Sequence, residues 1–79
     1  MKTADKLFEE LGYKKEIDSS MPMHEEIIYF KNSDYASNIK FVINNKLVRA
    51  YYGEEEKNAY IDMEILQAIN KKCEELKWI

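Results

Sequence analysis

The chain has 79 residues, of which 34% are charged and 46% hydrophobic, and this composition is ordinary for one globular domain. Its formal net charge of -3 gives no overall attraction to nucleic acid or anionic lipid, so binding of either would need a local basic patch. The longest apolar run, residues 27–30, is far too short to span a bilayer.

The N-terminus and the cysteine content indicate the cellular compartment. Residues 1–6 lack the apolar stretch and small-residue cleavage site of a secretory signal. Cys73 is the single cysteine and cannot form an intramolecular disulfide. We therefore expect a cytoplasmic protein, folded as a single domain over residues 1–79, with no membrane insertion.

The first predicted element is a short amphipathic helix that begins after Thr3, a favourable N-cap. Apolar residues then follow the i, i+3, i+4, i+7 spacing of one helical stripe: Ala4, Leu7, Phe8 and Leu11. Gly12, followed by Tyr13, predicts a Schellman-type end in which the residue after the glycine packs back on the last turn.

Residues 14–24 carry mixed signals. Tyr13, Lys15 and Ile17 have the alternation of a short strand, but residues 18–22, Asp-Ser-Ser-Met-Pro, are typical of a loop. We interpret the whole segment as a loop.

Three strands are predicted next. Residues 25–31 are rich in β-branched and aromatic side chains, residues 32–37 are typical of a turn, and residues 39–52 read as a β-hairpin. An Asn44-Asn45 loop of type I′ would fix the register of this hairpin. The sequence therefore predicts a three-stranded antiparallel meander.

The last predicted element is a second helix, which follows the acidic run of residues 54–56. Asp62 can cap this helix, and Ile61 and Leu66 can form a hydrophobic staple across its start. Its apolar stripe contains Ile65, Leu66, Ile69, Cys73 and Leu76. The predicted fold is thus α+β in two layers, with the order helix, three-stranded meander, helix, and with both helices on one face of the sheet.

The expected hairpin register divides its side chains between two faces, and both faces are rich in apolar or aromatic residues. The face expected under the helices holds Ile39, Phe41, Ile43, Val48, Ala50 and Tyr52. The second face holds Lys40, Val42, Leu47, Arg49 and Tyr51, and if Ile28 and Phe30 point to the core it also gains Ile27 and Tyr29. Because two helices, each about 10 Å across, cover a three-stranded ribbon on one side only, we expect the second face to stay open.

Different interpretations of this second face remain open. The first helix could cross over and cover it, or its side chains could simply be exposed one by one. Alternatively, a partner protein or a second copy of the chain covers a patch formed by Ile27, Tyr29, Val42, Leu47 and Tyr51 and rimmed by Lys31, Lys40 and Arg49.

Nucleic acid is the less favoured partner. Tyr29 and Tyr51, with Lys40 and Arg49 beside them, resemble a platform on which single-stranded bases stack. The glutamates at residues 54–56 follow at once, however, and would repel phosphate.

The sequence gives little support for catalysis or metal binding. His24 is the only histidine, and no spacing predicts a nucleophile with its base. Met21 and Met23 beside His24 could bind a soft metal ion, and Glu25 and Glu26 beside His24 a harder one, but the sequence offers no second cluster of ligands to complete either site. Cys73 reads as a small core residue. We therefore expect a protein that is not an enzyme and that needs no metal and no cofactor.

Both ends of the chain resemble a known group of proteins. TADKLFEELGYKK at residues 3–15 and IDMEILQAINKKCEELKWI at residues 61–79 are similar to small uncharacterised proteins encoded in prophages of low-GC Gram-positive bacteria. The resemblance leaves the predicted sheet unmatched and brings no activity, ligand or functional residue with it. It implies a phage accessory protein, a class that often binds and redirects or inhibits a host or defence protein. We therefore expect a protein-binding module for a host or phage protein, or for a second copy of itself.

Overall fold

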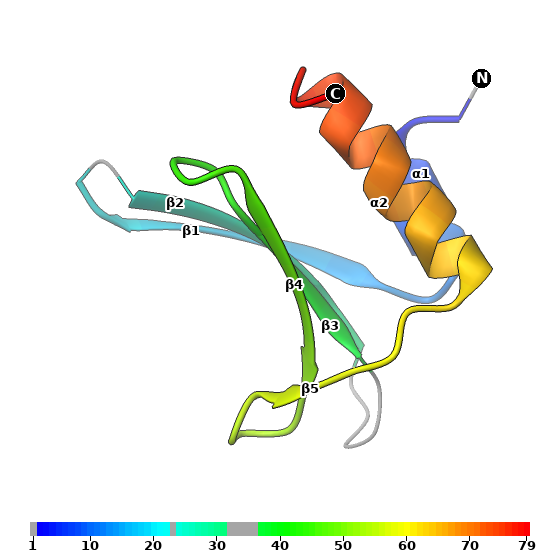
Figure 1. Ribbon diagram of the computed structural model, residues 1–79, viewed down its shortest axis with the longest axis horizontal. Coiled ribbons are helices and arrows are strands. Elements are labelled where there is room, and N and C mark those ends of the chain that lie inside the picture. The colour runs from blue at the N-terminus through cyan, green and yellow to red at the C-terminus, as the bar shows by residue number, and fades with distance from the viewer. Residues whose placement is uncertain (1, 23, 32–36) are drawn as a thin grey trace.

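The computed structural model describes residues 2–22, 24–31 and 37–79. Its elements are α1 (Ala4–Glu10), β1 (Lys14–Met21), β2 (His24–Phe30), β3 (Asn38–Val42), β4 (Leu47–Tyr52), β5 (Lys57–Asn58) and α2 (Met63–Glu75). The strands form one antiparallel sheet in the order β1-β2-β3-β4-β5, and the two helices lie together on one side of it (Figure 1). The fold is therefore α+β, as predicted, but its sheet has five strands instead of three. Most of the predicted turn at residues 32–37 lies outside the described residues.

Within the segment interpreted as a loop, residues 14–24, Lys14–Met21 instead form β1 and His24 begins β2. Every residue of β1 is exposed because β1 is an edge strand, so its sequence has no need for a buried apolar face. The loop-forming residues appear as an irregularity of register between Asp18 and Met21, where the Ser20 amide donates to the Asp18 carboxylate at 3.1 Å. The loop interpretation was wrong because an exposed edge strand and a loop have similar compositions.

The predicted ends of α1 are confirmed. The Thr3 hydroxyl accepts a hydrogen bond from the Lys6 amide, as an N-cap does. At the other end Gly12 has a φ of 92°, the Gly12 amide donates to the Glu9 carbonyl, and the Tyr13 amide donates to the Phe8 carbonyl. These two bonds make a Schellman motif.

Helix α2 begins at the predicted cap, since the Asp62 carboxylate accepts from the Ile65 amide at 2.9 Å. It ends in a second Schellman motif, in which Lys77 takes the position that glycine holds after α1, with a φ of 61°. The Trp78 amide donates to the Cys73 carbonyl, and the Trp78 ring lies 6.2 Å from that of Phe41. The end of the chain is thereby folded back onto the core.

The hairpin of β3 and β4 has the predicted register but a different turn. Phe41 pairs with Val48 and Ile39 with Ala50, as expected. The turn is not type I′, however, because Lys46 has the positive φ (55°) and neither asparagine does.

The face assignment of β2 was wrong. Ile27 pairs with Phe41 and Tyr29 with Ile39, so Ile27 and Tyr29 lie under the helices. The sheet side that they were expected to share with Val42 carries Ile28 and Phe30 instead. The register between β2 and β3 decides this, and the sequence pattern alone does not fix that register.

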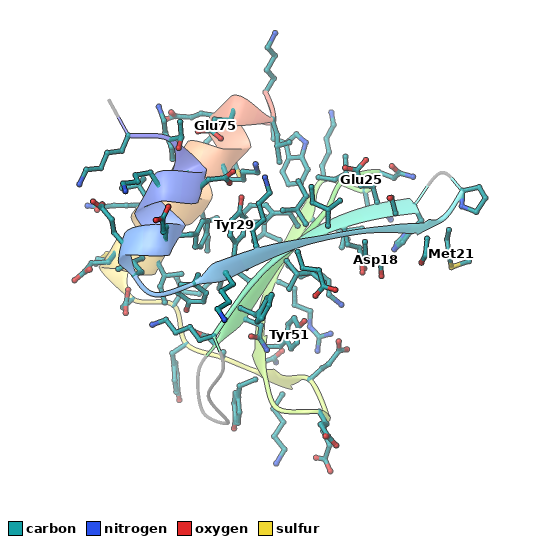
Figure 2. All side chains as sticks on the ribbon, turned by 180° about the vertical axis from the view of Figure 1, so that it is seen from behind. Asp18, Met21, Glu25, Tyr29, Tyr51 and Glu75 are labelled. Carbon is teal, nitrogen blue, oxygen red and sulfur yellow. The ribbon has the colours of Figure 1, made fainter. Side chains whose placement is uncertain are left out.

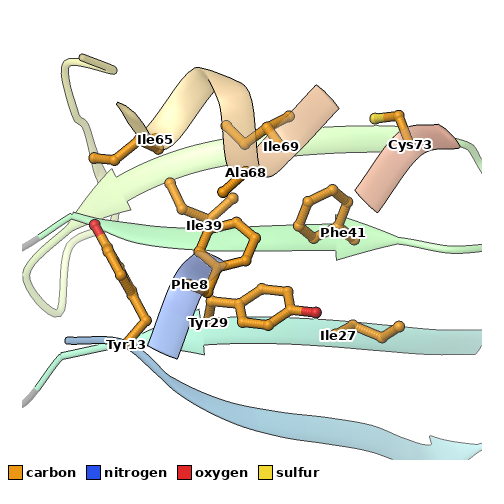
Figure 3. Packing of buried hydrophobic residues seen from close by; sticks show 10 residues of the cluster. All are labelled: Phe8, Tyr13, Ile27, Tyr29, Ile39, Phe41, Ile65, Ala68, Ile69 and Cys73. Carbon is orange, nitrogen blue, oxygen red and sulfur yellow. The ribbon is translucent and has the colours of Figure 1, made fainter. Parts of the chain in front are cut away.

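The core lies between the helices and the sheet (Figure 3). The Phe8 ring stacks on Tyr29 with 3.9 Å between centroids, and Phe41 meets Tyr29 edge to face at 5.8 Å. The buried cluster consists of Phe8, Tyr13, Ile27, Tyr29, Ile39, Phe41, Ile65, Ala68, Ile69 and Cys73. Because Phe8 belongs to this cluster, α1 packs on the same face as α2 and does not cover the opposite one.

Candidate interaction face

The side of the sheet opposite to the helices is the candidate site, and we call it the open face. By the strand registers it carries Lys14, Glu16, Asp18, Glu26, Ile28, Phe30, Asn38, Lys40, Val42, Leu47, Arg49, Tyr51 and Asn58. In the part of the chain that the structure describes, no helix packs on it. Figure 2 shows Tyr29 between the sheet and the helices and Tyr51 on the far side of the sheet.

Five of the seven residues predicted for partner binding lie on the open face: Lys40, Val42, Leu47, Arg49 and Tyr51. Ile27 and Tyr29 do not, because both are in the core. Lys31, expected at the rim, lies over the ring of Tyr13, 4.7 Å from its centroid.

The apolar residues of the open face lie on three strands, with Lys40 opposite Ile28 and Glu26 opposite Val42. Leu47 and Val42 are cross-strand partners, and Leu47 is 56% exposed. Ile28 and Phe30 of β2 are half-buried. Their side chains take the places of Ile27 and Tyr29 on this face, so one aliphatic and one aromatic residue replace another such pair.

The polar part is a cluster that surrounds Tyr51, which is only 9% exposed although it points away from the helices. The Lys40 ammonium lies 5.1 Å from the centroid of the Tyr51 ring, and the Arg49 guanidinium carbon lies 5.5 Å from it. These distances are typical of cation–π contacts. The two cations therefore cover the ring and leave little of it to solvent.

Glu56 pairs with both cations. Its carboxylate accepts from Lys40 at 3.3 Å and from Arg49 at 3.0 Å. The hydrogen bond from Lys40, and then the one from Arg49, lower the pKa of Glu56. Glu26 adds a second acid, 3.9 Å from the Lys40 ammonium. The cations that the sequence placed here are thus already paired within the chain.

Sequence reasoning did not find Glu56 as a part of this face. It treated residues 54–56 as one acidic run, whereas the turn that joins β4 to β5 brings Glu56 alone onto Lys40 and Arg49. The strand β5 itself is only two residues long and has no apolar pattern that would have indicated it.

A second group of exposed apolar side chains lies off the sheet, along the connection from β5 and the start of α2. Tyr60 is 97% exposed, and Ile61, Met63 and Leu66 are also exposed. Tyr60 borders an open pocket together with Ser37, Tyr52 and Ala59. This group is separate from the open face and provides a comparison for it.

We also searched the described residues for a metal site, a membrane-spanning helix and a reactive cysteine. They contain no cluster of three His, Cys, Asp or Glu side chains that could hold a metal ion. Neither of their helices has the length and apolar character needed to cross a membrane. Cys73 lies in the core, and burial raises the pKa of its thiol.

Comparison of the chain with protein-family models, with curated proteins and with solved structures finds no significant match.

Proposed function

We propose that this protein is a non-enzymatic binding module that takes a protein partner on its open face. The exposure of Leu47 carries the proposal. This side chain is not needed to fill the core, and together with its cross-strand partner Val42 it presents an apolar surface to water. Apolar side chains surrounded by polar residues are typical of protein–protein interfaces.

A host or phage protein, or a second copy of the chain, is the partner that we propose. The resemblance of both helices to prophage-encoded proteins supports the first, since small phage proteins often act by binding a host protein. The open sheet supports either, because a strand surface that exposes Leu47 and Val42 can pack on another sheet or on a helix.

Single-stranded nucleic acid is less well supported than a protein partner. Tyr29, one of the two tyrosines considered for base stacking, lies in the core, and the Tyr51 ring is covered by Lys40 and Arg49. Glu56 pairs with both of these cations. A platform for bases needs exposed rings and unpaired positive charge, and this face has neither at Tyr51.

The test uses two substitutions of equally exposed strand residues on opposite sides of the sheet. Leu47 is 56% exposed on the open face, and Ile17 is 53% exposed on the helix side of β1. Leu47→Lys should stay folded by circular dichroism and lose its partner in a pull-down, or its self-association in sedimentation. Ile17→Lys should retain both.

Four outcomes would count against this proposal. Unfolding of Leu47→Lys would show that this side chain is internal to the fold. Loss of binding in Ile17→Lys but not in Leu47→Lys would place the site on the other side. Binding that survives Leu47→Lys but not Tyr60→Ser would move the site to the exposed group at the start of α2. A steep decline of binding with added salt would indicate phosphate contacts instead.

A further inference from the structure

The contact of Glu56 with the open face resembles a bound ligand in its geometry. The two carboxylate oxygens of Glu56 are divided between two cations, with Oε1 3.3 Å from Lys40 Nζ and Oε2 3.0 Å from Arg49 Nη1. Arg49 Nη2 also donates to the main-chain carbonyl of Glu56 at 2.6 Å. The site therefore contacts both the side chain and the backbone of one glutamate residue.

The residues that contact Glu56 or lie beneath it come from two neighbouring strands, β3 and β4. The buried Tyr51 ring lies beneath both cations, so Lys40 and Arg49 both lie over the same ring. Lys40 comes from β3 and Arg49 from β4, directly opposite each other in the sheet. The strand register thus places Lys40 and Arg49 opposite each other, with Tyr51 two residues after Arg49 on the same face.

Glu56 lies in a turn, whereas Lys40, Arg49 and Tyr51, which contact it or lie beneath it, belong to strands. It ends the turn between β4 and β5, and its φ of 51° lies in the left-handed region, which residues other than glycine rarely adopt. The strand that follows is only two residues long. The Glu56 amide donates to the Gly53 carbonyl at 3.2 Å, and Lys46 ends the β3–β4 turn in the same way with a φ of 55°. The turn itself therefore sets this conformation, and the Glu56 side chain can leave Lys40 and Arg49 without a change of strand register.

We propose that Lys40, Arg49 and Tyr51 form a binding site for one acidic residue of a partner peptide, and that Glu56 occupies this site until the partner displaces it. This inference rests on the proposed function, because it names the chemistry that the open face recognises next to Leu47. The apolar surface then supplies contact area, and the cation pair supplies selection for an acidic side chain.

A peptide fits the site better than a nucleic acid does. Arg49 donates to one carboxylate oxygen and to the main-chain carbonyl of the same residue, an arrangement that one acidic residue of a peptide reproduces. A nucleic acid would also bring a phosphate charge with every nucleotide close to Glu26, whose carboxylate lies 3.9 Å from Lys40. A single carboxylate avoids most of this repulsion.

The experiment compares Glu56→Gln with Glu55→Gln. Both substitutions change the net charge by the same amount, but the Glu55 carboxylate contacts Lys57 at 3.7 Å and lies outside the site. The probe is a hexaglutamate peptide, titrated against each labelled protein while the amide and side-chain resonances of Lys40 and Arg49 are followed by NMR. If Glu56 fills the site for nine-tenths of the time, its removal should tighten peptide binding about tenfold, whereas Glu55→Gln should behave as the unmodified protein does.

Further variants and probes sharpen the result. Arg49→Gln in the Glu56→Gln background should abolish the gain. Equal peptide binding by the Glu56→Gln and Glu55→Gln variants would overturn the proposal. Tighter binding of a short oligothymidylate than of hexaglutamate to Glu56→Gln would overturn it as well, in favour of phosphate.

The proposal stays testable if Glu56→Gln does not fold. Hexaglutamate at high concentration must then shift the resonances of Lys40, Arg49 and Glu56 together in the unmodified protein, and their constancy would overturn it. Failure of this inference is distinct from failure of the proposed function. Hexaglutamate has no apolar side chain, so its binding reports on the acidic-residue site, whereas Leu47→Lys reports on the apolar surface.

Discussion

The Tyr29 hydroxyl donates a hydrogen bond of 2.5 Å to the Asp5 carboxylate, which ties the central part of β2 to the first turn of α1. Burial first, and then this bond, raise the pKa of the Tyr29 phenol. Lys15 and Lys72 bring positive charge to the same carboxylate at 3.0 Å and 3.8 Å. Asp5 therefore links the helix layer to the sheet through polar groups at the border of the core.

Removal of the Asp5 carboxylate should leave the buried Tyr29 hydroxyl without its partner. We expect Asp5→Ala to lower the free energy of unfolding by about 1–3 kcal/mol, because a buried polar group without a partner keeps its desolvation cost. Tyr29→Phe in the same background should restore part of the loss, since it removes the orphaned hydroxyl. Urea denaturation of the two single variants and the double variant measures this coupling. Additive effects of the two substitutions would contradict it.

The Asp5 carboxylate should also make stability depend on pH. Burial raises its pKa, but the hydrogen bonds from Tyr29 and Lys15 and the charges of Lys15 and Lys72 outweigh burial, so the pKa lies below its ordinary value of 3.8. The unfolded chain therefore binds more protons than the folded chain in the acid range. The stabilisation is complete above the ordinary pKa and is lost as the pH falls through the lowered one.

We accordingly expect Asp5→Asn to be less stable than the unmodified protein at neutral pH, with a difference that shrinks as the pH falls below 3.8. Urea denaturation at a series of pH values measures the difference. A gap that grows toward acid pH would show that the carboxylate is not stabilised in the folded state.

The positions that follow the two helices should respond in opposite ways when glycine is introduced at Lys77 and removed at Gly12. Lys77 holds the left-handed position of the second Schellman motif with a φ of 61°, so Lys77→Gly should raise the free energy of unfolding by about 0.5–1 kcal/mol. Gly12 holds the same position after α1 with a φ of 92°, and Gly12→Ala should cost about 1–2 kcal/mol. A β-carbon at Gly12 meets Lys31 at an ordinary 3.5 Å, so the backbone conformation and not crowding sets this cost. Thermal denaturation of both variants tests the pair, and a shift in the same direction for both would contradict it.

Ile69 of α2 is buried in the core cluster, whereas Leu66, three residues before it, is exposed. We expect Ile69→Ala to cost about 2–5 kcal/mol, because it opens a cavity between the helices and the sheet. Leu66→Ala removes a side chain of the same size from the surface and should cost much less. Urea denaturation separates them, and equal losses would mean that Leu66 also packs in the core.

Local patterns in the sequence were sufficient for the helices and for the central hairpin. The caps at Thr3 and Asp62, the stop at Gly12 and the pairing of Phe41 with Val48 depend on neighbouring residues and on short-range hydrogen bonds, which a sequence displays directly. The predicted open surface at Val42 and Leu47 followed from this hairpin register, because side chains alternate strictly along a strand.

Only the tertiary structure decided the rest. The alignment of β2 with β3 placed Ile27 and Tyr29 in the core, because pairing across a connection of this length depends on how the whole sheet packs under the helices. The exposed edge strand β1 has no apolar face to display in its sequence, and it is a strand because β2 offers it hydrogen-bonding partners. The position of Glu56 over Lys40 and Arg49 likewise arises from a turn that brings together charges from β3, β4 and the β4–β5 connection. The sequence by itself determined which faces each local element has, and the long-range pairing of strands decided which of those faces meet.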